Sequence, residues 1–172
     1  MADQAASPEQ KSEETLAEEL LKRLLAGMGI SAQIEIRRRE ENLVLCIEGC
    51  NEAGRVIGKD GNVLHQLQHL LNLMLMKKLK TRETVLVDVE GYRDRRLRRL
   101  TARAQEAANK VKQRGNPIIL EPMHAADRRI VHLALKDDSQ IETTSVNEDR
   151  ETGMKSVRIS LHQEEPPPPP AE

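Results

Sequence analysis

One glycine-rich corner, residues 54–61, constrains the fold of this chain more than any other stretch of its sequence. It reads Gly-Arg-Val-Ile-Gly-Lys-Asp-Gly, and an apolar-rich segment follows at residues 62–80. Two glycines that flank two polar residues between helical patterns predict a tight corner between two helices, because glycine adopts positive φ and lets another backbone approach closely. The second helix would begin with unpaired N–H groups directed at the loop, where an anion such as phosphate can bind.

The same corner does not fit a nucleotide-binding P-loop. That motif needs four residues between its glycines and a Ser or Thr after the lysine to hold magnesium. Here three residues separate Gly54 from Gly58, and Asp60 follows Lys59. We therefore interpret residues 58–61 as a Gly-x-x-Gly corner between helices.

Helix and strand patterns on both sides of the corner follow one another in a specific order. The segments are helix 13–25, strand 32–38, strand 43–47, helix 52–57, helix 62–80 and strand 84–89. Ser12 is the expected cap of the first helix, and Gly27 with Gly29 is its expected stop signal. Residues 43–47 are continuously apolar, which is typical of a strand covered on both sides. The predicted order is α-β-β-α-α-β, with a hairpin turn at residues 40–42.

This order, with Gly-x-x-Gly between consecutive helices, resembles that of a type II KH domain over about residues 13–90. The resemblance implies that the loop clamps the sugar–phosphate backbone of a single strand. Backbone N–H groups would hold the phosphate, while Lys59 adds positive charge and Asp60 subtracts some. An ordinary helix–helix turn is the alternative interpretation. The candidate nucleic-acid-binding residues here are Arg55, Ile57, Gly58, Lys59, Asp60 and Gly61.

The basic charge of the chain is concentrated in a predicted helix at residues 92–114. Its apolar stripe consists of Leu97, Leu100, Ala104, Ala108 and Val111. At about 3.6 residues per turn, the opposite face carries Arg95, Arg99, Arg103 and Lys110. Arg95 and Arg99 are the candidate phosphate contacts on this face, and a simply solvated helix face is the alternative.

Beyond that helix, the sequence predicts a short strand at 118–120, a helix at 123–136 and strands at 141–146 and 156–161. Arg128 and His132 are four residues apart, so they share one face of the predicted helix. An arginine offers a fork of donors to phosphate oxygens, and a histidine becomes cationic if its pKa is raised. The alternative is an exposed arginine beside a structural histidine.

The Arg-x-x-x-His spacing, with Pro122-Met123 before it and Leu133-Ala134-Leu135 after it, resembles the R-three-H domain over about residues 91–161. That family is named for the spacing, and the resemblance implies binding of single-stranded nucleic acid. A type II KH domain followed by an R-three-H domain resembles the Jag family (the SpoIIIJ-associated protein) of bacteria. Longer members carry a further N-terminal domain, and we expect only a short acidic leader here.

The expected fold class is therefore α+β, with two small domains. Their expected bounds are a disordered acidic leader at 1–12, the KH domain at 13–90, the R-three-H domain at 91–162 and a disordered proline-rich tail at 163–172. The acidic residues of the leader and of the last third offset the basic helix, and the net charge of the whole chain is −1. This overall balance argues against a simple polycation that coats nucleic acid.

Composition narrows the classes of function further. Tyr92 is the only aromatic residue, so a nucleic-acid site must work without stacking platforms, which disfavours RRM-like and OB-like readers. No apolar run approaches the ~18 residues needed to span a membrane. Cys46 and Cys50 form no disulfide framework, and a reducing cytoplasm is the default location. His65 and His69 are four residues apart on a predicted helix but lack a third metal ligand, so we expect no metal site. The sequence also offers no carboxylate cluster for catalysis, and we expect no cofactor or catalytic residue.

These patterns predict a protein that binds RNA without catalysing a reaction, acting as a bacterial RNA chaperone or post-transcriptional regulator. The expected partners are single-stranded RNA, with single-stranded DNA as a second option, and a small single-KH-domain protein. The alternative is a protein–protein scaffold, or an adaptor associated with a membrane insertase, whose nucleic-acid surfaces are vestigial.

Overall fold

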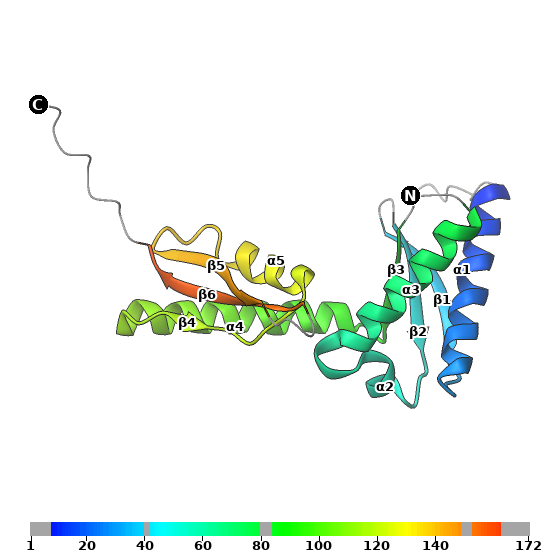
Figure 1. The fold of residues 1–172 in the computed structure, drawn as a ribbon, viewed down its shortest axis with the longest axis horizontal. Helices are drawn as coiled ribbons and strands as arrows, with labels where there is room; N and C mark the ends of the chain where they lie inside the picture. Colours follow the sequence, from blue (N-terminus) through cyan, green and yellow to red (C-terminus); the bar gives the residue numbers. More distant parts are fainter. Residues whose placement is uncertain (1–7, 40–41, 80–83, 149–152, 163–172) are drawn as a thin grey trace, which may run out of the picture. The chain divides into compact units, whose positions relative to one another are not determined.

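The computed structural model describes residues 8–39, 42–79, 84–148 and 153–162 (Figure 1). Two units emerge along the chain, and the division falls between Arg93 and Asp94. Helix and strand elements occur in the predicted order throughout, so the two-domain α+β class expected from the sequence is confirmed.

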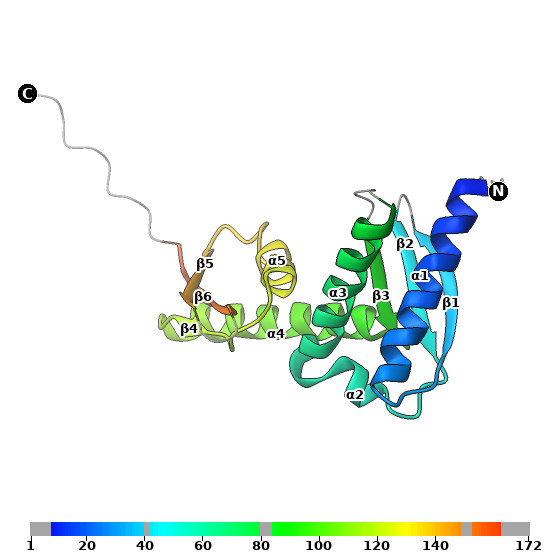
Figure 2. The same ribbon diagram turned by 45° about the vertical axis from the view of Figure 1, so that its right-hand side comes forward.

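The first unit is a three-stranded sheet with two long helices on one face (Figures 1 and 2). The sheet order is β1-β2-β3; β1 pairs with β2 antiparallel, and β2 pairs with β3 parallel. The elements are α1 (Pro8–Gly27), β1 (Gln33–Arg39), β2 (Asn42–Glu48), α2 (Ala53–Ile57), the 3-10 turn η1 (Lys59–Gly61), α3 (Asn62–Leu79) and β3 (Val85–Val89).

Alternate strand residues of the first unit face the helices and form its core. Leu45 of β2 and Val87 of β3 are opposite each other in the sheet, and both are fully buried together with Leu21 of α1 and Leu71 of α3. At roughly 1.5–3 kcal/mol for each fully buried large aliphatic side chain, this cluster fixes α3 against the sheet. The glycine corner that starts α3 is positioned accordingly.

The outer edge of β3 is closed by side chains rather than by another strand. Asn72 of α3 donates to the Val85 carbonyl at 2.9 Å and accepts from the Val85 N–H at 2.8 Å. Gln68 accepts from the Val87 N–H at 3.0 Å, and Arg93 donates to the Val87 carbonyl at 2.8 Å. An open strand edge is a row of unpaired groups that another chain can pair with, and these three side chains occupy that row.

One prediction for the first unit needs correction, and it concerns the start of the first helix. Helix α1 begins at Pro8, so residues 8–12 are helical instead of disordered, and residues 1–7 lie outside the described part. A proline is tolerated in the first turn because its missing N–H has no intrahelical partner there. Strand β2 is buried along residues 43–47, as its continuous apolar run predicted. The expected turn at 40–42 lies largely outside the described residues.

The second unit packs two helices on a small antiparallel sheet of order β4-β6-β5. Its core joins Ala104 and Val111 of α4 to Val131 of α5 and to Val157 and Ile159 of β6, all fully buried. The elements are α4 (Tyr92–Arg114), β4 (Ile118–Ile119), α5 (Ala125–Ala134), β5 (Ile141–Glu148) and β6 (Lys155–Leu161). The predicted tail at 163–172 lies outside the described residues.

Two details of the second unit differ from the sequence-based expectation. Helix α5 starts at Ala125 rather than at residue 123, because Met123 is instead paired with Lys155 in an extended bridge. Leu97, expected in the apolar stripe of α4, is 46% exposed. The buried stripe begins one turn later at Leu100 and also includes Ala107.

Candidate nucleic-acid interface

The Gly-x-x-Gly corner has a backbone that its glycines alone can adopt without strain or overlap. Gly58 has φ 72° and Gly61 has φ 82°, both in the left-handed region. A Cβ at Gly58 would overlap Val63 of α3, lying 2.8 Å from its Cβ and 3.0 Å from its backbone nitrogen. Between them Asp60 also has positive φ, at 53°, which Asp tolerates better than most residues. The corner is therefore a fixed shape rather than a loose linker.

The second glycine of the corner lies against the side chain of Tyr92. A Cβ at Gly61 would lie 2.8 Å from Tyr92 Oη and 3.1 Å from its Cε1. Gly61 is buried, while Lys59 and Asp60 beside it are exposed. The two central residues of the motif therefore face solvent, and helix α3 starts directly behind them at Asn62.

The remaining predicted residues of the first unit differ in their surroundings. Arg55 pairs with Glu52 and donates to the Met28 carbonyl at 3.0 Å, so its charge is locally compensated. Ile57 is half-buried and packs against the core of the unit. Within the described residues, Lys59 forms no ion pair, which makes it the cation at this corner that a phosphate could recruit at least cost.

The arginines of α4 differ in how exposed their side chains are. Arg95 and Arg99, the two candidate phosphate contacts on this helix, are exposed. Arg96 instead turns toward α5 and donates through Nε and Nη2 to one oxygen of Asp127, at 3.1 and 3.0 Å. Both side chains of this pair are nearly buried, at 13% and 15% exposure. Arg96 therefore ties α4 to α5, and Arg103 is similarly paired with Glu121 at the surface.

Arg128 and His132 lie on one face of α5 and meet through a serine of β5. Arg128 donates from Nε to Ser145 Oγ at 3.2 Å and from Nη1 to the Met123 carbonyl at 3.1 Å. His132 contacts the same Ser145 Oγ through Nε2 at 3.2 Å and Thr143 Oγ1 through Nδ1 at 2.6 Å. The four side chains form one polar cluster, which we call the Arg128–His132 cluster: Arg128, His132, Thr143 and Ser145.

A phosphate would be attracted most strongly by a protonated, cationic His132, but the surroundings of this residue favour the neutral form. Partial burial lowers the pKa of His132 below its ordinary value of 6.5, and the positive charge of Arg128 lowers this pKa further. The imidazole is therefore neutral at neutral pH. It can offer a neutral donor or acceptor, while Arg128 provides the positive charge of the cluster.

Sequence reasoning missed Thr143 and Ser145. Their alternation with Ile141 along β5 places all three on the face that packs toward the helices, and this alternation is visible in the sequence. Nothing in the sequence, however, indicated which helix would lie opposite that face. The missed residues thus depend on tertiary packing of α5 against the sheet.

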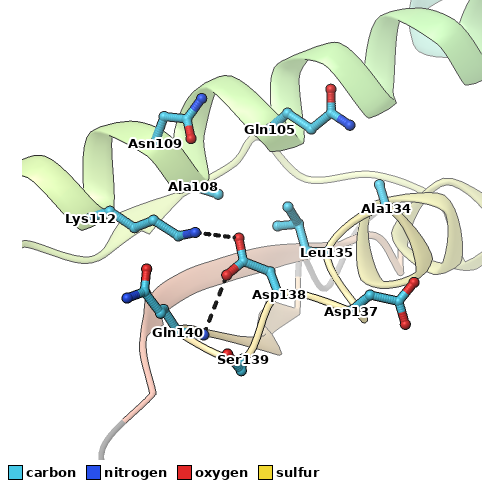
Figure 3. Close-up of a pocket in the computed structure, with 10 residues that line it drawn as sticks. All are labelled: Gln105, Ala108, Asn109, Lys112, Ala134, Leu135, Asp137, Asp138, Ser139 and Gln140. Atoms are coloured by element: carbon cyan, nitrogen blue, oxygen red, sulfur yellow. Dashed lines mark hydrogen bonds and ion pairs between the residues drawn. The ribbon is translucent and has the colours of Figure 1, made fainter.

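The second unit also has a polar cleft of about 680 Å³ between α4 and the segment that joins α5 to β5 (Figure 3). Lys112 is the only cation among its lining residues, and it pairs with Asp138 at 2.7 Å. Lys112 also lowers the pKa of Asp138, which keeps that carboxylate ionised. With Asp137 adjacent, the cleft has no surplus positive charge and does not suit a phosphate.

Other candidate sites considered from the sequence gain no support in the described ranges. His65 and His69 are exposed, and no group of three metal-ligating side chains converges in the part of the chain that the structure describes. Burial raises the pKa of the Cys46 thiol, which makes this cysteine a poor nucleophile. Among the described helices, none is long and apolar enough to cross a membrane.

Comparison with known proteins places both candidate clusters inside recognised domains. Residues 14–89 match the model of the KhpA/KhpB KH domain, and residues 98–155 match the model of the R-three-H domain. The Gly-x-x-Gly corner lies in the first match, and the Arg128–His132 cluster lies in the second.

Several bacterial proteins that bear the name RNA-binding protein KhpB are similar to this chain. The protein from Clostridium symbiosum is 35% identical over 138 residues, which cover 80% of this chain and 60% of that protein. The protein from Lactiplantibacillus plantarum is 27% identical over 159 residues, which cover 86% of this chain and 49% of that protein. The Bacillus subtilis protein is 35% identical over 99 residues, which cover 56% of this chain and 48% of that protein. The chain thus spans about half of the length of these relatives.

Proposed function

Because this chain combines a KH domain of the KhpA/KhpB family with an R-three-H domain, we propose that it binds single-stranded RNA through both. The observation that carries the proposal is the Gly-x-x-Gly corner, whose two glycines have positive φ and no room for a Cβ. A rigid turn with exposed central residues at the start of an 18-residue helix is suited to a phosphate. The name of the relatives, RNA-binding protein, points to the same ligand.

In the first domain, most hydrogen bonds to the phosphate would come from uncharged backbone N–H groups. The first turn of a helix carries backbone N–H groups without intrahelical partners, and those of α3 would be the donors here. Two amides next to them are already engaged within the turn, because Gly61 donates to the Gly58 carbonyl and Asn62 to the Lys59 carbonyl. Lys59 adds one exposed positive charge. Arg55 would have to leave Glu52 to contribute, and Asp60 offsets part of the charge. The phosphate would therefore be held by shape and backbone dipoles, with Lys59 as the main electrostatic partner.

In the second domain, the Arg128–His132 cluster offers donors of two kinds. Arg128 has five N–H donors, and its hydrogen bonds engage Nε and Nη1, which leaves capacity at Nη2 for a phosphate oxygen. Ser145 and the neutral His132 can donate to or accept from a base edge or a ribose hydroxyl. Arg95 and Arg99 of α4 are proposed as further phosphate contacts.

Two modest sites on one chain can together give useful affinity. Once one domain holds an RNA strand, binding of the second becomes intramolecular, and its effective concentration reaches the millimolar range for short linkers. We propose this mode for a bacterial cytoplasmic RNA chaperone or post-transcriptional regulator that is not an enzyme. A small single-KH-domain protein is the proposed protein partner.

The proposal is tested by titrating the 172-residue chain with a fluorescently labelled single-stranded RNA at low salt. Gly58→Asp with Lys59→Asp should abolish binding at the corner, because it adds two acids and a clash with Val63. A matched control carries Gly49→Asp and Lys78→Asp; Gly49 has φ 61° and open space around it, and Lys78 is exposed about 24 Å along α3 from the corner. The control should bind RNA like the unmodified chain.

A scaffold role is the second candidate, and the same variants separate the two. If the corner variant retains RNA but loses a co-purifying protein partner, the scaffold interpretation replaces the proposal. Lys59→Asp alone, which disturbs no packing, keeps the test valid if the double variant unfolds. Repeating the titration with the DNA version of the same sequence measures the preference for the 2′-hydroxyl.

A further inference from the structure

We propose that Tyr92 is a positioning residue for the Gly-x-x-Gly corner: its ring supports Gly61 and fixes the loop for phosphate binding. This inference rests on the proposed function of the corner. It gives the only aromatic residue of the chain a role other than stacking on a base. The ring would act through the loop backbone, without touching the RNA.

The ring of Tyr92 lies directly against Gly61. A Cβ at Gly61 would lie 2.8, 3.1 and 3.3 Å from Tyr92 Oη, Cε1 and Cζ, so the ring fills the space where any side chain at this position would be. Gly61 is buried, and Tyr92 is half-buried against the core of the first unit. The second glycine of the motif is therefore required by Tyr92 as well as by its φ of 82°.

The second support is the way in which the chain on both sides of Tyr92 is fixed. Asp88 at the end of β3 accepts from the Gly91 N–H at 2.8 Å and from the Arg93 N–H at 3.0 Å. The Arg93 side chain donates to the Val87 carbonyl at 2.8 Å and to Gln68 of α3. The ring is thus held by groups of the rigid sheet and of the same helix that begins at the corner.

The consequence concerns the cost of ordering the loop. A loop that is already fixed in the free protein loses less conformational entropy when it binds a ligand. Without the ring, Gly61 would have open space beside it, and a glycine has more backbone freedom to lose than any other residue. Removing the ring should therefore weaken RNA binding about tenfold, which is the affinity equivalent of ordering roughly one backbone residue.

The test compares Tyr92→Phe, Tyr92→Leu and Tyr92→Ala by titrating the full chain with a labelled single-stranded oligouridylate. Tyr92→Phe keeps the ring and should bind within about twofold of the unmodified chain, while Leu and Ala should lose about tenfold. Rescue by Phe distinguishes support by the ring from a hydrogen bond of the hydroxyl. Equal affinity for all three variants would overturn the proposal.

A double-mutant cycle with Gly61→Ala gives a readout that general destabilisation would not produce. In the unmodified chain the new Cβ clashes with the ring, so affinity should fall. In the Tyr92→Ala background that clash is absent, and the same substitution should weaken binding several-fold less, retaining only the strain of its positive φ. Additive losses would show that Tyr92 and Gly61 act independently and would refute the inference.

Hydrogen exchange separates failure of this inference from failure of the proposed function. Exchange at the amides of Lys59, Asp60 and Gly61 is measured without RNA and should be faster in Tyr92→Leu than in Tyr92→Phe. If the unmodified chain binds no RNA, the proposed function fails, and this measurement still decides the role of the ring. Unchanged loop exchange in Tyr92→Leu would refute it even if RNA binding is observed.

Discussion

Asn72 offers a sharp test of how the first unit is held together, because one side chain bonds both backbone groups of Val85. The two bonds are 2.9 and 2.8 Å long and lie in a partly buried position. Asn72→Ala removes both and leaves the outer edge of β3 without that partner. At about 1 kcal/mol for each net hydrogen bond, the free energy of unfolding should fall by about 2 kcal/mol.

The chain itself provides a selective probe for this measurement. Tyr92 belongs to the first unit and is the only aromatic residue, so tyrosine fluorescence follows unfolding of that unit while far-ultraviolet circular dichroism follows the whole chain. For a domain of 60–100 residues, a loss of about 2 kcal/mol corresponds to a fall in melting temperature of roughly 8–16 °C.

Two further variants make the Asn72 prediction specific. Asn72→Asp keeps the acceptor for the Val85 N–H but loses the donor, so it should be destabilising as well. Gln66→Ala, at an exposed position of the same helix, controls for helix propensity and should change the midpoint little. A midpoint for Asn72→Ala that matches the Gln66→Ala control would mean that the edge bonds contribute nothing, and the reasoning would be wrong.

The remaining predictions concern the second unit and the salt response. Folding lowers the pKa of His132, so below pH 6.5 the unfolded chain binds more protons at this residue than the folded chain does. The stability of the unmodified chain relative to His132→Gln should therefore be highest above pH 6.5 and decline as the pH falls below it. Urea titrations across that pH range measure this difference. Asp127→Ala removes the carboxylate that pairs with the nearly buried Arg96 and should lower the free energy of unfolding by about 3 kcal/mol in the same titrations. Glu106→Ala breaks an exposed pair with Lys110 and should cost far less. With about three or four phosphates neutralised, the logarithm of the RNA association constant should fall with the logarithm of salt concentration at a slope of about −2 to −3; a slope near −6 would indicate a much larger basic surface.

The fold could be predicted largely from local patterns. Helix α4 has its expected bounds, because its apolar residues recur at helical spacing and are followed by Gly115 and Pro117, which stop a helix. The start of α1 was missed because residues 8–12 carry no apolar periodicity, although a helix that begins at Pro8 is sterically allowed. The start of α5 was placed too early because Met123 fits a helical stripe, while its backbone is used in a bridge to Lys155.

The candidate sites divide in the same way between local and long-range information. The shared face of Arg128 and His132 follows from their spacing within one helix, whereas Ser145, which joins them, comes from a strand more than a dozen residues away. Likewise, the glycines of the corner are visible in the sequence, but the contact of Gly61 with Tyr92 depends on how β3 returns beside α3. Local spacing therefore identified Arg128, His132 and the two glycines, and tertiary packing brought Ser145 and Tyr92 beside them.

The distribution of charge bears on how a chain with net charge −1 could hold a polyanion. Several of its cations are already engaged by acids: Arg55 by Glu52, Arg96 by Asp127, Arg103 by Glu121, Lys110 by Glu106 and Lys112 by Asp138. Long-range attraction is then weak, and non-specific coating of nucleic acid is disfavoured. Under the proposed function, affinity has to come from donors that are fixed before binding, which are backbone N–H groups at the corner and hydroxyl and imidazole groups beside Arg128. Rigid supports such as Tyr92 and the Arg96–Asp127 pair would accordingly matter as much as the residues that touch RNA.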